Sequence, residues 1–212
     1  MKTAIITLTR KGSKRFKNKM FYPLFGTPLY MHTIAHGLHL AKYLECEYYF
    51  AHDFDDVAYH VPHEIKRKNE YAGDIHKTCE EIKSFGIDAD IYILLQCTQP
   101  IRDLSAILDA HKRIIQQKDV VAIASGKIMK EGYYYAIDQP LNFNQEERTD
   151  NGCKKVPVIK ENGNFYVFKK SQLEKKHILD ISDGEKFDIA IDNIDNDIDT
   201  YEDLVKLEMA VR

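Results

Sequence analysis

The sequence predicts one α/β domain in three layers, a mostly parallel β-sheet with helices on both faces. Short apolar runs rich in β-branched residues alternate along the chain with segments whose apolar residues recur at helical spacing. The run DIYILL at residues 90–95 is apolar almost throughout, which is typical of a central parallel strand that is covered on both faces. The 212 residues, 44% of them hydrophobic, can bury one full core, so residues 1–212 are expected to form a single domain.

The expected elements follow one another in the order strand, helix, strand. Strands are expected at residues 3–8, 47–52, 90–95, 120–124, 162–167 and 189–191. The first helix should begin with Thr27 as N-cap and Pro28 as first helical residue, and later helices should end at Gly86, cover 103–117 and 171–176, and follow Thr200. Residues 54–69 are expected to be irregular. Residues 126–160 have poor periodicity and predict an excursion from the domain.

A basic loop follows the first strand. Its candidate anion-binding residues are Arg10, Gly12, Ser13, Lys14, Arg15 and Lys19. Glycine lets the backbone approach an anion closely, backbone N–H groups point at it, and the cationic side chains neutralise it. The loop is therefore a candidate phosphate site. A block of like charge can also be a solvated, flexible segment, and the charges alone do not decide between the two interpretations.

Composition excludes several function classes. The net charge of −3 makes the basic loop a local feature and argues against a general nucleic-acid binder. No apolar run is long enough to span a bilayer or to form the core of a signal peptide, so a cytoplasmic protein with no membrane partner is expected. The four cysteines are widely spaced and contain no C-x-x-C pair, which argues against a zinc site or a disulfide framework.

An acidic run precedes the expected last helix. Its carboxylates are Asp192, Asp195, Asp197, Asp199 and Asp203. One interpretation is a solvated turn in which Thr200 and Asp203 form a capping box. The other is that Asp197 and Asp199 bind Mg²⁺, with Mn²⁺ as a possible substitute. Strand-like alternation places both carboxylates on one side and Ile198 toward the core, and two carboxylates with substrate phosphates are a usual way to hold Mg²⁺.

Four motifs together resemble the cytidylyltransferases that activate acidic sugars, the CMP-sialic acid synthetase (acylneuraminate cytidylyltransferase) family and its relatives for keto-deoxy-octulosonic, legionaminic and pseudaminic acids. The motifs are Arg10-x-x-Ser13-x-Arg15-x-x-x-Lys19, Gln96-x-Thr98-x-Pro100-x-Arg102, the strand Asn162-Gly163-x-x-Tyr166, and Asp197-Ile198-Asp199-Thr200. They occur in the family's order over most of the chain. The sequence departs from the family's pattern at Lys11-Gly12, Met20, Cys97, Gln99 and Asn164.

The resemblance implies a Rossmann-like nucleotidyltransferase fold and the transfer of CMP from CTP to a nonulosonic or related sugar acid, with release of pyrophosphate. It implies that Arg10, Lys19 and Asp199 are catalytic and that Asp197 and Asp199 hold the metal. It places the nucleotide on Arg10, Gly12, Ser13, Lys14, Arg15, Lys19, Asp53 and Gln96. It places the sugar acid on Thr98, Gln99, Arg102, Asn162 and Tyr166. It also implies a homodimer formed through the excursion near residues 126–160.

Two other functions remain open at this point. A metal-dependent glycosyltransferase would use an Asp-x-Asp pair on a nucleotide-sugar, although that motif normally follows a strand in the middle of the chain. A non-catalytic nucleotide- or sugar-binding homologue would explain the departures at Met20, Cys97 and Gln99. Release of pyrophosphate from CTP distinguishes the transferase from both alternatives.

Overall fold

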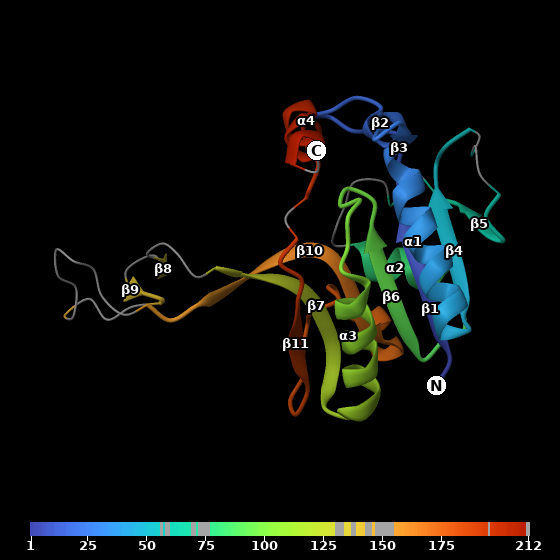
Figure 1. Cartoon of the computed structure of the whole chain (residues 1–212). Helices are drawn as coiled ribbons and strands as arrows, with labels where there is room; N and C mark the ends of the chain where they lie inside the picture. The colour runs from blue at the N-terminus through green and yellow to red at the C-terminus, as the bar shows by residue number, and fades with distance from the viewer. Residues whose placement is uncertain are drawn as a thin grey trace.

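The computed structural model describes residues 1–55, 57, 60–68, 71, 77–129, 134–136, 139–142, 146, 155–194 and 196–210. Within these residues a seven-stranded sheet forms the middle layer (Figure 1). Its strand order is β11 (Lys186–Ile191), β7 (Val120–Met129), β10 (Val158–Lys169), β6 (Ile91–Gln96), β1 (Thr3–Leu8), β4 (Glu47–His52) and β5 (His63–Lys66). β10 runs antiparallel to β6 and β7, and the other neighbouring pairs are parallel. The predicted fold class is therefore confirmed.

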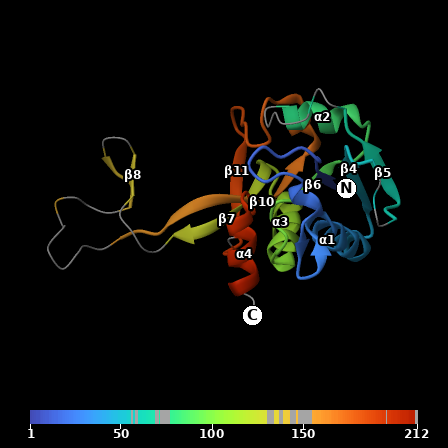
Figure 2. The same cartoon turned by 90° about the horizontal axis from the view of Figure 1, so that it is seen from above.

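Helices cover both faces of the sheet. α1 (Leu29–Leu44) and α3 (Leu104–Gln116) lie on one face, and α2 (Thr78–Ser84) and the 3₁₀ helix η5 (Lys170–Glu174) lie on the other (Figures 1 and 2). Alternation along β6 divides the core, because Ile91, Ile93 and Leu95 pack toward α1 and α3 while Tyr92 and Leu94 pack toward α2. The predicted central strand is thus covered on both sides.

Two expectations about the elements near the first helix and the second strand are wrong. α1 begins at Leu29, because Thr27–Pro28 form β3, which pairs antiparallel with β2 (Pro23–Leu24) and sets Pro28 at the helix cap. The segment expected to be irregular contains β5, which pairs parallel with β4 at the sheet edge. β5 is a four-residue edge strand whose side chains are exposed or half-buried, so it carries no apolar signal in the sequence.

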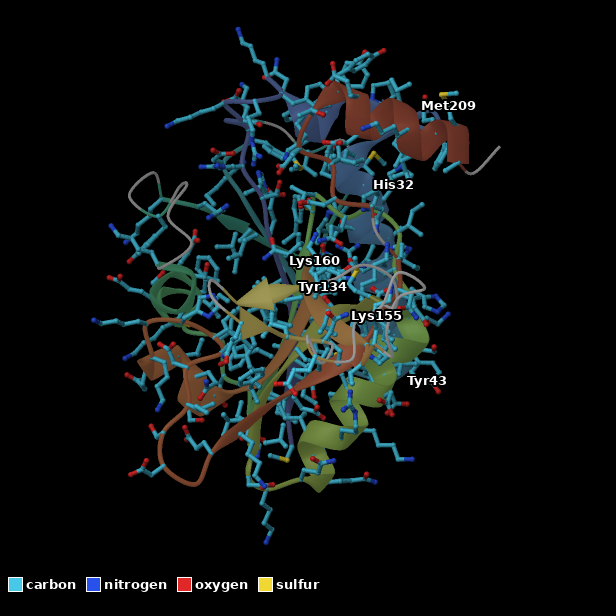
Figure 3. All side chains as sticks on the ribbon, turned by 90° about the vertical axis from the view of Figure 1, so that its left-hand side faces the viewer. His32, Tyr43, Tyr134, Lys155, Lys160 and Met209 are labelled. Carbon is cyan, nitrogen blue, oxygen red and sulfur yellow. The ribbon has the colours of Figure 1, made fainter. Side chains whose placement is uncertain are left out.

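β7 and β10 continue beyond the sheet as a two-stranded arm, which ends near the short strands β8 (Tyr135–Ala136) and β9 (Gln139–Pro140) (Figures 1 and 2). This arm lies where the excursion was expected, and much of residues 126–160 lies outside the described residues. Figure 3 views the molecule from the side of the arm, with Tyr134, Lys155 and Lys160 over the middle of the view and Met209 of α4 (Tyr201–Ala210) above them. Among the described residues, no helix is long and apolar enough to cross a membrane.

Candidate active site

A cleft of about 600 Å³ opens where β1 and β6 end at the same edge of the sheet. Ligands of open α/β sheets bind at the carboxyl ends of parallel strands, which is where this cleft lies. Nine of the predicted site residues line it: Arg10, Gly12, Ser13, Lys14, Arg15, Lys19, Gln96, Thr98 and Asp199. The cleft therefore brings the basic loop, the end of β6 and the acidic segment to one place.

Contacts on two sides hold the basic loop. On one side, the Lys11 backbone N–H donates to Asp53 Oδ1 at 2.5 Å, and the Lys11 ammonium pairs with Asp55 at 2.6 Å. On the other side, the Phe16 ring packs against the rings of Tyr22 and Tyr201, with centroid distances of 5.1 and 6.0 Å. The observed contact of Asp53 is with the loop backbone, which it helps to position, and its predicted contact with nucleotide stays a prediction.

The carboxylate of Asp199 joins the basic loop to the acidic segment. Arg15 Nη2 lies 2.8 Å from Asp199 Oδ2, and Lys19 Nζ lies 3.2 Å from Asp199 Oδ1. Lys19 also donates to the backbone carbonyl of Ile198 at 2.8 Å. Lys19 is buried, with only 6% of the residue accessible.

The acidic segment has the predicted alternation. Ile198 is fully buried, Asp197 is exposed and Asp199 is half-buried, so the two carboxylates flank a core anchor. The Ile198 N–H donates to the Thr98 carbonyl at 2.8 Å, which fixes this segment against the residues after β6. Partial loss of hydration raises the pKa of Asp197 above its usual range, and the negative charge of Asp199 raises it further.

The donor set fits a hard divalent cation. Two carboxylates separated by one residue are oxygen ligands of the kind that Mg²⁺ takes, and the neighbouring cationic loop can hold the phosphates that complete its coordination. Among the described residues, no group of three His, Cys, Asp or Glu side chains is placed to hold a metal, so the protein itself offers two carboxylates. The capping box is also present, since Thr200 and Asp203 exchange hydrogen bonds of 2.8 and 3.3 Å before α4.

Arg102 was predicted to contact the substrate, but the structure buries it beneath the cleft with 6% exposed. Its guanidinium donates to the Gln96 carbonyl, to Thr33 Oγ1 at 3.3 Å and to His36 Nδ1 at 3.3 Å. Burial lowers the pKa of Arg102 to about 10, and burial together with the Arg102 charge lowers the pKa of His36 to about 4. A neutral His36 accepts from Arg102, so this group supports the end of β6 from below.

The other predicted substrate residues lie in a polar layer behind the cleft. Gln99 is buried and donates to the Asn162 carbonyl. Asn162 in turn donates to the Asp192 carbonyl at 2.8 Å, and the Tyr166 hydroxyl donates to Glu161 at 2.5 Å. Among the described residues that line the cleft, none of these is found. Their direct contact with substrate stays a prediction.

Arg67, Tyr71 and Thr78 also line the cleft, and no sequence motif predicts them. Arg67 pairs bidentately with Glu81, at 2.7 and 2.6 Å, and donates to the Thr9 carbonyl at 3.0 Å. Both partners of the pair are buried. The sequence signal for this pair is weak, because Arg67 stands between Lys66 and Lys68 and Glu81 follows only 14 residues later. It cannot be interpreted without the fold.

Comparison with solved structures finds many similar molecules, and two of them are cytidylyl-transferring synthases by name. The CTP complex of CMP:2-keto-3-deoxy-manno-octonic acid synthetase has 16% identity and a TM-score of 0.70, over 100% of this chain and 98% of that one. The 4-diphosphocytidyl-2C-methyl-D-erythritol synthase of Anaerococcus prevotii has 15% identity and a TM-score of 0.62, over 99% and 95% of the two chains. No curated protein sequence matches the chain. The family model for cytidylyltransferases matches residues 4–203, and the chain therefore belongs to the cytidylyltransferase family, a family of nucleotidyltransferase enzymes.

Proposed function

We propose that this cytidylyltransferase transfers CMP from CTP to a hydroxyl of an acidic sugar, a nonulosonic or related keto-deoxy acid, and releases pyrophosphate. The observation that carries the proposal is the cleft in which Arg15 and Lys19 meet Asp199, because it combines cations for a triphosphate with a carboxylate for a metal. The ordered motifs of the acid-sugar family in this sequence support an acidic acceptor.

The basic loop would bind the triphosphate. Arg10, Lys14, Arg15 and Lys19 all line the cleft and supply positive charge along one wall. Arg15 and Lys19 are paired with Asp199 in the structure, so phosphate oxygens would replace this carboxylate as their partner. Gln96 and Arg67 line the same cleft and would border the nucleoside.

Asp197 and Asp199 would hold Mg²⁺, or Mn²⁺ in its place. When bound, this cation would supply charge stabilisation to the phosphates and lower the pKa of the acceptor hydroxyl. The protein's own contribution is position and electrostatics, because the acceptor oxygen must lie in line with the α-phosphorus and the bond to pyrophosphate. Arg10 and Lys19 would stabilise the negative charge that develops on the leaving pyrophosphate.

The acceptor would lie beside Thr98, with Gln99, Asn162 and Tyr166 shaping that wall and Arg102 supporting it. The arm formed by β7 and β10 projects from the body and would form the contact of a homodimer. Family membership supports cytidylyl transfer over glycosyl transfer, because a glycosyltransferase would start from a nucleotide-sugar and release no pyrophosphate.

The deciding experiment is a pyrophosphate-release screen of CTP, UTP, ATP and GTP against a panel of nonulosonic and octulosonic acids with Mg²⁺. We expect release with CTP and one class of sugar acid. A parallel thermal-shift measurement should show that CTP with Mg²⁺ raises the unfolding temperature more than ATP or GTP does, because ligand that binds only the native state stabilises it. Equal shifts with all four triphosphates and no release would leave a non-catalytic phosphate binder.

A further inference from the structure

β10 contains an irregularity next to the cleft. It pairs with β7 up to Glu161, opposite Gly126, and again from Tyr166, opposite Ala124. Residues 162–165 therefore lie opposite the single residue Ser125, whose hydroxyl accepts from the Phe165 N–H at 3.0 Å. Bulges of this kind next to active sites re-aim a side chain. Here the bulge lies beside the end of β6, because Phe165 pairs with Leu95.

The re-aimed side chain is that of Asn164. It is fully buried, and its amide nitrogen donates to Asp192 Oδ2 at 2.6 Å and to the Ile101 carbonyl at 3.1 Å. One side chain on β10 therefore joins the start of the acidic segment to the segment that follows β6. An alanine at this position could donate neither bond.

Further contacts continue this link toward Asp197 and Asp199. The Asn196 side chain accepts from the Ile101 N–H at 2.9 Å and donates to the Ile101 carbonyl at 2.9 Å. Two residues further on, the Ile198 N–H donates to the Thr98 carbonyl at 2.8 Å. The acidic segment is thus connected to the residues after β6 at three points, Asp192, Asn196 and Ile198. Asp197 and Asp199 stand on either side of Ile198, the last of these points.

We infer that Asn164 is a positioning residue of the transfer reaction. Through Asp192 and Ile101 it sets the height of the acidic segment above the end of β6, and so the distance of Asp197 and Asp199 from the cleft wall at Gln96 and Thr98. It is not a catalytic residue, because its amide is fully buried. The inference rests on the proposed function in that these carboxylates serve the reaction.

The physical reason is the geometry that metal-assisted transfer needs. Mg²⁺ accepts only a narrow range of ligand positions, so a displaced carboxylate costs more in turnover than in nucleotide affinity. The triphosphate is held mainly by the loop, which contacts Asp199 but has its own supports at Asp53 and Tyr201. Loss of the Asn164 bonds should therefore affect turnover and metal affinity before it affects the KM for CTP.

The test compares Asn164→Ala with a matched control, Gln172→Ala. Gln172 is also a fully buried amide that donates to two carbonyls, those of Ile178 and Asp180, at 2.8 and 2.7 Å. It lies in η5, away from the cleft, so its loss costs stability of the same kind without touching the acidic segment. Asn164→Ser is a second variant. It supplies one hydroxyl donor and changes the side-chain volume less than Asn164→Ala does.

The first readout is hydrogen–deuterium exchange at the Ile198 amide in the free protein, without metal or substrate. We expect exchange about tenfold faster in Asn164→Ala, the scale set by losing buried hydrogen bonds, an intermediate rate in Asn164→Ser and no change in Gln172→Ala. An unchanged rate in both Asn164 variants, or the same acceleration in Gln172→Ala, would overturn the inference.

The second readout is kinetic. Asn164→Ala should lower kcat about tenfold or more and raise the Mg²⁺ concentration needed for half-maximal rate, with the KM for CTP changed by less than about twofold. Equal losses of kcat in Gln172→Ala and Asn164→Ala at matched stability would also overturn it. If the wild-type protein releases no pyrophosphate with any acceptor, the proposed function fails, while the exchange rates still decide whether Asn164 positions the segment.

Discussion

The buried Arg67–Glu81 pair should be among the most sensitive points of the cleft wall. Glu81→Gln keeps the shape of the side chain but removes its charge, and it turns one of its two acceptors into a donor that faces the guanidinium. The Arg67 charge is then left buried without a counter-charge, with the Thr9 carbonyl and one neutral amide oxygen as its acceptors. Both side chains are less than a tenth exposed, at 9% and 2%, so water cannot replace the lost partner.

The expected loss follows from this burial. Removing one partner of a buried ion pair costs about 3–5 kcal/mol, whereas an exposed pair contributes about 1 kcal/mol or less. An unfolding entropy of about 2.1 cal/mol/K per residue, over 212 residues, gives about 0.45 kcal/mol per degree. Glu81→Gln should therefore lower Tm by about 7–11 °C, a large part of the total for a typical domain.

The matched control is Glu174→Gln. Glu174 pairs with Lys83 at 2.6 Å, the same separation as the shorter Arg67–Glu81 contact, but the two side chains are 66% and 54% exposed. This variant should lower Tm by about 2 °C or less. Thermal unfolding followed by circular dichroism measures both. Equal shifts in the two variants would refute the claim that burial of the Arg67–Glu81 pair makes it indispensable.

Three further outcomes are expected. Arg10→Ala should weaken CTP binding by about tenfold or more, measured by calorimetry, with Tm unchanged within about 2 °C because the residue is exposed; unchanged affinity would contradict the loop assignment. Asp197→Asn and Asp199→Asn should each abolish most pyrophosphate release while CTP still binds, with partial rescue by Mn²⁺. Retained turnover in both variants would contradict the metal site and favour the interpretation of this segment as a capped turn. The pKa of His36 is lowered to about 4 in the folded protein, so between pH 6.5 and pH 4 the unfolded chain binds a proton that the folded protein does not. The free energy of unfolding should therefore fall as pH drops from 6.5 to 4. His36→Gln should flatten this fall, worth at most about 3 kcal/mol; equal pH profiles of urea unfolding would contradict it.

The sequence by itself determined the elements with strong local signals. β1 and β6 are predicted as buried strands because their apolar runs are continuous. The helix predicted over 103–117 is α3, with Asp103 as its N-cap, where the Asp103 side chain accepts from the Ser105 N–H at 2.9 Å. The order of four short motifs was enough to indicate the family. These features depend on residues close in the chain, so periodicity, capping and spacing can show them.

Only the tertiary structure decided which predicted residues face the cleft. Gln99 and Arg102 stand in the same motif as Gln96 and Thr98, yet the first two turn into the protein and the other two line the site. Arg67 and Asn164 acquired their roles from partners that no local pattern connects to them, Glu81 through the fold of α2 and Asp192 through the bulge in β10. Burial and long-range hydrogen bonds arise from how the strands and helices pack together. They can therefore be assigned only once the fold is known, and not from local patterns in a single sequence.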